Sequence, residues 1–138
     1  MDSTRLTDDL TVAPQIRPED MAKIAALGFR IVINNRPDGE IEPELHSARM
    51  AEAARAAGMD YVHIPYIPGH ITQEMLDETR AALTTAPAFA YCRSGNRSTV
   101  LWGLAQAGQQ PVADIVETAA RAGYDISGFA PLIERLAD

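Results

Sequence analysis

The sequence has little of three things: cysteine, basic side chains and long apolar runs. Its single cysteine, Cys92, excludes an intramolecular disulfide, a Cys-x-x-Cys redox pair and a metal site built from several cysteines. The 12 Lys and Arg residues are outnumbered by 19 Asp and Glu, and the net charge of −7 argues against nucleic acid as a partner. No segment approaches a membrane span, and residues 1–10 lack the features of a signal peptide. We therefore expect a cytoplasmic protein without membrane association.

Length and apolar content are sufficient for one compact domain. The chain has 138 residues, of which 46% are hydrophobic, and we predict a single domain over residues 5–138 after a loose, polar start over residues 1–9. The predicted strands are 10–13, 29–33, 59–65 and 88–91, and the predicted helices are 18–27, 43–57, 73–83, 98–105, 111–122 and 129–136. This alternation predicts a three-layer α/β fold in which helices flank a mostly parallel sheet of about four strands.

The segment 91–98 has the composition of an anion-binding loop between a strand and a helix. Cys92 is followed within five residues by Arg93 and Arg97, and nearby cations together with a helix N-terminus favour the thiolate form of a cysteine. A lone cysteine is more often a buried structural residue, but that role gives no reason for two adjacent arginines. We therefore predict Cys92 and Arg97 as catalytic residues. The predicted anion cradle comprises Arg93, Ser94, Gly95, Asn96 and Ser98.

Two further loops follow predicted strands and are expected at the same edge of the sheet as Cys92. Residues 34–40 also have the composition of a solvated turn, but their position makes Arg36 a candidate for binding the anion. Asp38 from this loop and His70 from the loop 65–72 are candidates for an acid or base, with a surface position as the alternative for each. His63 lies inside a predicted strand, so we expect it to be packed or hydrogen-bonded rather than catalytic.

Four sequence blocks occur in order along nearly the whole chain. They are Val-Ile-Asn-Asn-Arg-Pro-Asp-Gly-Glu at 32–40, Tyr-Val-His-Ile-Pro at 61–65, Ala-Tyr-Cys-Arg-Ser-Gly-Asn-Arg-Ser at 90–98 and Ala-Gly-Tyr-Asp at 122–125. Together they resemble the bacterial phosphatase-like domain of beta-lactamase hydrolase-like proteins, a family also described as sulfurtransferases. The resemblance implies a protein-tyrosine-phosphatase-like fold. It also implies relatives that occur alone or fused to a metallo-β-lactamase-type persulfide dioxygenase.

The resemblance leaves two reactions open, and the active loop discriminates between them. Tyrosine and dual-specificity phosphatases carry Cys-x5-Arg, whereas here Ser98 occupies the arginine position and Arg97 comes one residue early. The loop is similar instead to that of a rhodanese, which holds a persulfide on its cysteine. A phosphatase also needs a proton donor for the departing oxygen, and residues 65–72, the usual place for it, contain no carboxylate.

We therefore predict a sulfurtransferase. Cys92 would take the outer sulfur of a small anionic donor, such as thiosulfate or glutathione persulfide, and pass it to a thiol acceptor. A persulfide dioxygenase or another sulfide-oxidation enzyme is the expected partner. The first alternative is a phosphatase that cleaves phosphotyrosine or aryl phosphate monoesters through a phosphoenzyme on Cys92. The second is a partner domain that binds an anion or persulfide without turnover. None of the three implies a metal or an organic cofactor.

Overall fold

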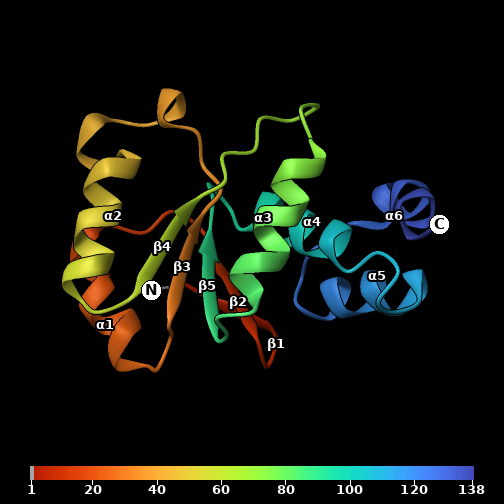
Figure 1. Ribbon diagram of the computed structural model, residues 1–138, viewed down its shortest axis with the longest axis horizontal. Helices are drawn as coiled ribbons and strands as arrows, with labels where there is room; N and C mark the ends of the chain where they lie inside the picture. Colours follow the sequence, from red (N-terminus) through yellow and green to blue (C-terminus); the bar gives the residue numbers. More distant parts are fainter. Residues whose placement is uncertain (1) are drawn as a thin grey trace.

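The computed structural model describes residues 2–138 as an α/β fold around one five-stranded sheet (Figure 1). The strands are β1 (Thr4–Thr7), β2 (Leu10–Ala13), β3 (Ile31–Asn34), β4 (Asp60–His63) and β5 (Ala88–Tyr91). They lie in the order β1-β2-β5-β3-β4, and every pair is parallel except β1 with β2. The predicted α/β fold with a mostly parallel sheet is confirmed.

The edge strand β1 lies where the sequence predicts loose chain, so the predicted number of strands was one too low. Only Leu6 of its four residues is buried, and the segment therefore lacks the apolar run by which a strand is recognised. Its backbone pairs antiparallel with β2, and Leu6 joins the core. Backbone hydrogen bonding to β2, rather than the β-propensity of its own residues, therefore forms this strand.

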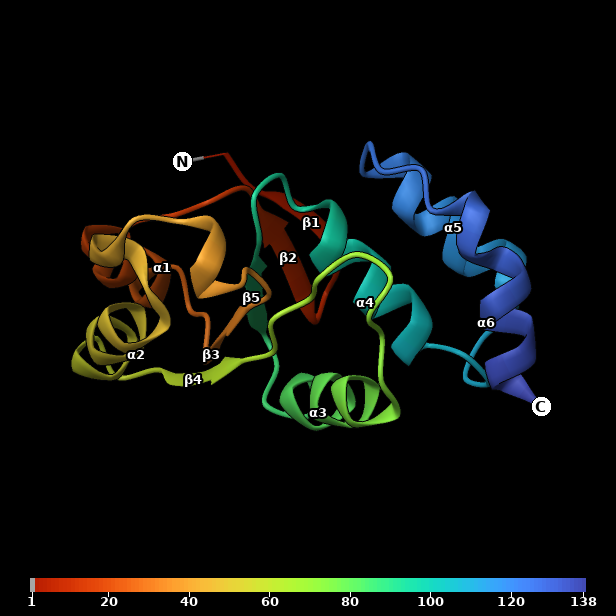
Figure 2. The ribbon, with the colours of Figure 1, turned by 90° about the horizontal axis from the view of Figure 1, so that it is seen from above.

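Residues 2–138 form six α-helices around the sheet. They are α1 (Met21–Ala26), α2 (Ser47–Ala56), α3 (Gln73–Leu83), α4 (Asn96–Ala105), α5 (Val112–Arg121) and α6 (Ala130–Ala137). α1 and α2 lie on one face and α3 and α4 on the other, while α5 and α6 pack outside α4 (Figures 1 and 2). The three predicted layers are therefore present, with an additional pair of helices on one side.

The central strand β5 determines how closely the two helical layers approach. Phe89 and Tyr91 pack with α1 and α2, whereas Ala88 and Ala90 face the side of α3 and α4. These small side chains leave room for α4, in which residues 98–105 are all buried. A helix buried on every side is held firmly by its neighbours, and its first turn is the one that follows Cys92.

Two helices begin at different residues from those predicted. α4 begins at Asn96 rather than Ser98, because Gly95 already occupies its N-cap position. α2 begins at Ser47, because Pro43–Leu45 forms a separate 3₁₀ turn. The backbone N–H of Ser47 donates to Asp38 Oδ1 over 2.7 Å, and this contact across the loop fixes the start of α2.

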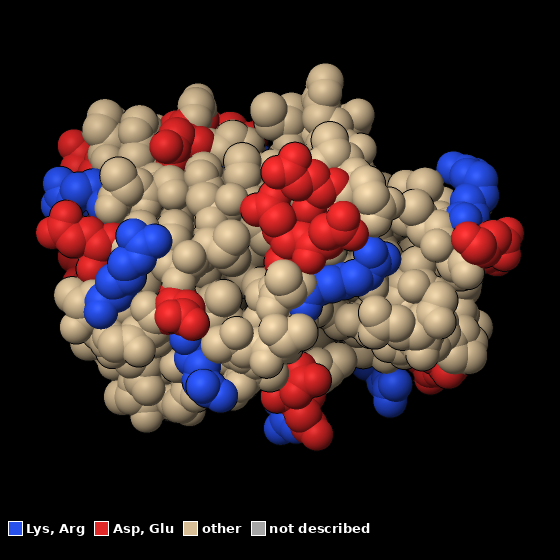
Figure 3. Space-filling model, in the orientation of Figure 1, with Lys and Arg blue, Asp and Glu red and all other residues tan. Residues whose placement is uncertain are grey.

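The surface over α3 is acidic. Figure 3 shows Asp and Glu side chains gathered at this helix, whose acidic residues are Glu74, Asp77 and Glu78. Arg80 pairs with Asp77 over 3.4 Å beside them. This face therefore carries part of the negative surplus of the chain. Within residues 2–138, no helix has both the length and the apolar character needed to cross a membrane.

Candidate active site

Three loops meet at the carboxyl edge of the parallel strands, as the sequence predicts. They follow β3, β4 and β5, and Figure 2 looks down on them. Between them is an open cleft with three arginines and one carboxylate. Its lining residues are Arg36, Glu40, Pro68, Arg93, Ser94, Asn96 and Arg97. The positive side chains predicted from the sequence therefore converge on one place.

Asn35 joins the three loops. Its backbone N–H donates to the Tyr91 carbonyl over 2.8 Å, and its carbonyl accepts from the Tyr66 N–H over 3.0 Å. Its side-chain amide donates to the Ile64 carbonyl over 2.9 Å. Asn35 is buried, so these hydrogen bonds satisfy polar groups that water does not reach. The end of β5, and with it Cys92, is thereby fixed relative to the other two loops.

Cys92 lies fully buried at the base of the loop that joins β5 to α4. Its sulfur accepts a hydrogen bond from the Gly95 N–H over 3.1 Å. Gly95 has φ of 93°, a left-handed conformation that favours glycine and turns the chain into α4. The N–H groups at a helix start have no partners within the helix and stabilise negative charge. The loop is therefore built to hold a thiolate or a bound anion.

Tyr124, from the segment after α5, covers this loop. Its hydroxyl donates to the Ser94 carbonyl over 3.1 Å. A Cβ at Gly95 would lie only 2.3 Å from the Tyr124 hydroxyl oxygen, so the absence of a side chain at Gly95 permits this close approach. Partial burial, and secondly the electrostatic interaction with the nearby Cys92, raise the pKa of Tyr124. Tyr124 is therefore a neutral hydrogen-bond donor beside the cysteine loop.

Arg97 forms a bidentate ion pair with the carboxylate of Glu40. Its two terminal nitrogens donate to the two oxygens of Glu40 over 2.9 and 2.7 Å. Nη1 also donates to the Tyr66 carbonyl over 2.8 Å. The hydrogen bonds from Arg97 hold the pKa of Glu40 below its ordinary range, and the same pairing raises the pKa of Arg97. Both side chains are therefore charged near neutral pH.

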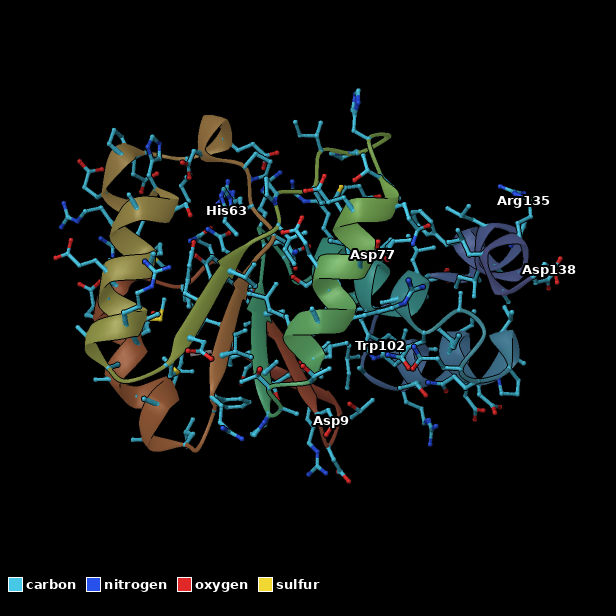
Figure 4. The ribbon with its side chains drawn as sticks, viewed as in Figure 1. Asp9, His63, Asp77, Trp102, Arg135 and Asp138 are labelled. Atoms are coloured by element: carbon cyan, nitrogen blue, oxygen red, sulfur yellow. The ribbon has the colours of Figure 1, made fainter. Side chains whose placement is uncertain are left out.

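Arg36 lies on the other side of Glu40. It donates to Gln15 Oε1 over 3.1 Å and to the backbone carbonyl of Glu40 over 3.2 Å. Its Nε is buried and has no hydrogen-bond partner among residues 2–138, although Glu40 Oε1 is 3.5 Å away. His63, labelled at the end of β4 in Figure 4, donates from Nε2 to the Arg36 carbonyl over 2.9 Å. His63 is therefore hydrogen-bonded, as predicted.

Most of the predicted binding residues come together at the cleft. Arg36, Arg93, Ser94, Asn96 and Arg97 line it, and Gly95 forms the loop beneath Tyr124. Ser98 is buried in the first turn of α4, and its hydroxyl has no hydrogen-bond partner within the described part of the chain.

The structure does not place the two acid–base candidates in the cleft. Asp38 uses its carboxylate to cap α2, and it is absent from the cleft lining. His70 is exposed in the turn after β4, where its backbone N–H donates to the Ile67 carbonyl over 2.9 Å. Neither residue lines the cleft, because Asp38 accepts a hydrogen bond at the start of α2 and His70 is exposed to solvent.

Sequence reasoning missed four participants. Glu40 belongs to the block 32–40, but the sequence offers no reason to assign its carboxylate a role in the site. Tyr124 belongs to the block 122–125, and its place in this block of the family resemblance is the only sign of a role in the sequence. Tyr66 contributes through its backbone carbonyl and Gln15 through a contact to Arg36, and no residue pattern distinguishes either.

A second polar hollow lies elsewhere, between α3, the end of α4 and the β1–β2 turn. Asp9 and Trp102, both labelled in Figure 4, are among the residues that line it. It contains neither the cysteine nor a histidine. In residues 2–138, no three His, Cys, Asp or Glu side chains gather closely enough to hold a metal ion. The cleft at the cysteine loop is therefore the candidate active site.

Known proteins share both the sequence pattern and the architecture. The profile of the phosphatase-like domain of beta-lactamase hydrolase-like proteins matches residues 2–109. The Beta-lactamase hydrolase-like protein of Agrobacterium fabrum is 33% identical over an alignment that covers 98% of this chain and 32% of that protein. This chain thus spans about a third of the length of that relative.

Solved structures extend the comparison. A protein of Neisseria meningitidis Z2491, described provisionally as a phosphatase, has a TM-score of 0.81 and 31% identity, with 96% of each chain covered. PTPMT1, solved in complex with PI(5)P, has a TM-score of 0.78 over 98% of this chain and 94% of its own. At 11% identity, the likeness to PTPMT1 shows the fold alone.

Proposed function

The chain belongs to the family of phosphatase-like domains of beta-lactamase hydrolase-like proteins, and from this membership we propose that it is a cysteine-dependent phosphatase of small phosphate monoesters. The observation that carries the proposal is the meeting of the Cys92 loop, the Arg97 guanidinium and a carboxylate at one cleft. The lack of a carboxylate in residues 65–72 favours sulfur transfer in the sequence alone. Glu40 removes that objection, because it reaches the cleft from the loop after β3.

The reaction has two steps in this proposal. The Cys92 thiolate attacks phosphorus, so that an S–P bond forms while the P–O bond to the alcohol or phenol breaks. Water then attacks the phosphocysteine, the S–P bond breaks, and inorganic phosphate and the thiolate are released. Arg97 and the N–H groups at the start of α4 stabilise the charge on the transferred phosphoryl group in both steps.

We assign proton transfer in this scheme to Glu40. It is the only carboxylate among the cleft-lining residues of the described chain. Hydrogen bonds from Arg97 keep its pKa low in the free protein. A phosphoryl group bound to Arg97 would replace those hydrogen bonds and add negative charge nearby, and both changes raise the pKa of a carboxyl group against the smaller lowering effect that Arg36 retains. Glu40 would then protonate the departing oxygen and later accept a proton from the attacking water.

Sulfur transfer is the second candidate, and the position of the arginine favours it. Arg97 is five residues after Cys92, whereas the phosphatase motif places it six residues after. The Cys92 thiolate would attack the outer sulfur of thiosulfate, forming a persulfide and releasing sulfite. A thiolate acceptor would then take that sulfur and regenerate the Cys92 thiolate. A persulfide dioxygenase remains the proposed partner for this reaction.

The experiment compares the two chemistries on one preparation. Wild-type protein and Cys92→Ser are each supplied with para-nitrophenyl phosphate, and separately with thiosulfate or glutathione persulfide plus a thiol acceptor. Phosphate release by the wild type alone supports the phosphatase. Sulfur transfer by the wild type without phosphate release overturns it in favour of the second candidate. Tight binding of anions with neither activity indicates a binding module.

A further inference from the structure

We propose that the Glu40 carboxylate occupies the anion-binding nitrogens of Arg97 in the free protein and moves toward Arg36 when an oxyanion binds. Glu40 thereby sets which anions the cleft accepts. The inference rests on the proposed function only in taking the cleft as the place where an oxyanion binds.

The contact between Glu40 and Arg97 has the geometry of ligand recognition. Two parallel hydrogen bonds of 2.9 and 2.7 Å join the two carboxylate oxygens to the two terminal nitrogens of the guanidinium. This is the arrangement by which an arginine binds two oxygens of a phosphate. With Nη1 also bonded to the Tyr66 carbonyl, three of the five N–H donors of Arg97 are engaged by the protein itself, and they include both that face outward from the two terminal nitrogens. A ligand that binds this pair of terminal nitrogens must therefore compete with Glu40.

The burial of Cys92 fits a closed state. The cysteine is fully buried and does not line the cleft, although its neighbours Arg93 and Ser94 do. A substrate in the cleft therefore cannot reach the sulfur until side chains at the cleft rearrange. Release of Glu40 from Arg97 is the rearrangement that also frees the anion-binding fork.

Arg36 offers Glu40 a second position. Its buried Nε already forms an ion pair with Glu40 but has no hydrogen bond of good geometry within residues 2–138, and an incompletely satisfied buried donor is costly. Glu40 Oε1 is already 3.5 Å from this nitrogen, just beyond hydrogen-bond distance for favourable geometry. Gln15 and the Glu40 carbonyl hold the rest of the Arg36 guanidinium in place. A small shift of the carboxylate would replace the Arg97 pairing with one to Arg36.

This arrangement selects anions by shape and charge. An anion that displaces Glu40 must supply two oxygens to the Arg97 fork and enough charge to compensate for the lost ion pair. A tetrahedral dianion meets both conditions, whereas chloride offers no such pair of oxygens. We therefore expect the cleft to prefer phosphate-like dianions to halides.

The test is titration calorimetry with inorganic phosphate. Glu40→Gln removes the competing charge, and we expect its Kd for phosphate to be about tenfold lower than that of the wild type. Glu42→Gln is the matched control, because Glu42 is an exposed carboxylate in the same loop and its removal changes the net charge equally. We expect Glu42→Gln to change the Kd by less than about twofold. Unchanged or weaker phosphate binding by Glu40→Gln would overturn the proposal and make Glu40 a fixed support for Arg97.

A second variant tests the role of Arg36. Arg36→Lys keeps the positive charge but removes the Nε–H that would receive Glu40. We expect it to weaken phosphate binding in the wild-type background and to have little effect in the Glu40→Gln background, a non-additivity that measures the coupling. An equal loss in both backgrounds would contradict the movement toward Arg36. These titrations need no turnover, so they test the role of Glu40 separately from the proposed reaction. If Glu40→Gln binds phosphate more tightly but the wild type releases no phosphate from esters, the inference about Glu40 stands and the proposed phosphatase activity is wrong.

Discussion

At the scale of single residues, the Glu40–Arg97 pair is central to the proposed chemistry. The two side chains are 57 positions apart in the chain, Glu40 in the loop after β3 and Arg97 in the first turn of α4, and they meet over two short hydrogen bonds. A carboxylate beside two arginines is stabilised in its charged form, and an arginine beside a carboxylate remains protonated. The proposed anion binding, proton transfer and closed state of the free protein all depend on this contact.

The pair gives stability a defined dependence on pH. The pKa of Glu40 lies below its ordinary value of 4.5, chiefly because of the hydrogen bonds from Arg97. The folded protein therefore binds the Glu40 proton less tightly than the unfolded chain does, and the stabilisation is present above about pH 5.5 and is lost as pH falls through the folded pKa.

Urea unfolding at a series of pH values checks this dependence. We expect the wild type to exceed Glu40→Gln in free energy of unfolding near neutral pH, and we expect this difference to shrink as the pH becomes acidic. The arginine side chain does not lose its proton in proteins, so Glu40 alone accounts for the difference between the two proteins. A difference that stayed constant down to about pH 3 would contradict the lowered pKa.

Gly95 provides a second test at this scale. Gly95→Ala places a Cβ against the Tyr124 hydroxyl in a left-handed backbone conformation, so we expect a loss of about 1–3 kcal/mol in the free energy of unfolding. Gly39→Ala is the control, because no atom lies within 4 Å of its added Cβ and its φ is not positive. We expect that change to stay within about 0.5 kcal/mol. Equal effects of the two substitutions in urea unfolding would argue against the close packing of Tyr124 on the cysteine loop.

At the scale of elements, α2 depends on a residue far from its own sequence. Asp38 accepts from the Ser47 N–H and so caps the helix from nine positions away. The neighbouring Pro43–Leu45 turn shortens the helix that the sequence predicts. Asp38 is therefore a structural residue of the loop that carries Arg36 and Glu40.

Substitution of Asp38 separates the structural role from a catalytic one. We expect Asp38→Ala to lower the free energy of unfolding by about 1 kcal/mol, and Asp38→Asn to lose less because an amide oxygen still accepts the hydrogen bond. Hydrolysis of para-nitrophenyl phosphate should retain a kcat within about threefold of the wild type for Asp38→Asn. A fall of about a hundredfold or more in kcat would instead restore Asp38 as the acid.

The elements that the sequence predicts well are those with a local pattern. β5 is recognised from four apolar residues, and α5 from its apolar stripe, because burial alone dictates their residue types. β1 is missed because backbone pairing with β2 forms it, and only Leu6 marks its burial. The start of α4 is missed by two residues because Gly95, which looks like a loop residue, is its N-cap.

The same distinction applies to the site. Cys92, Arg93 and Arg97 lie within six consecutive residues, so the sequence alone suggests that they act together. Glu40 acts only through its contact with the distant first turn of α4, and nothing in its neighbourhood distinguishes it from Asp38 as the acidic partner. Which of two nearby carboxylates points into the cleft and which caps a helix is decided by the path of the loop after β3.

At the scale of the whole molecule, alternating strands and helices are sufficient to predict the fold but not the reaction. Strand order brings the loops after β3, β4 and β5 to one edge, and this placement follows from the parallel sheet. The sequence alone predicts sulfur transfer, because residues 65–72 lack a carboxylate and Arg97 is displaced by one position. The assembled cleft supplies the carboxylate from another loop, so only the arginine spacing still favours sulfur transfer.

Direct capture of the intermediate on Cys92 is the measurement that tests the central proposal. Wild-type protein and Cys92→Ser are mixed with para-nitrophenyl phosphate, quenched rapidly and weighed by intact mass spectrometry. A cysteine phosphatase predicts the added mass of one phosphoryl group on the wild type, none on Cys92→Ser, and phosphate release that depends on the same residue. The contradicting result is a wild type that acquires no phosphoryl group and releases no phosphate, yet gains one sulfur on Cys92 from thiosulfate.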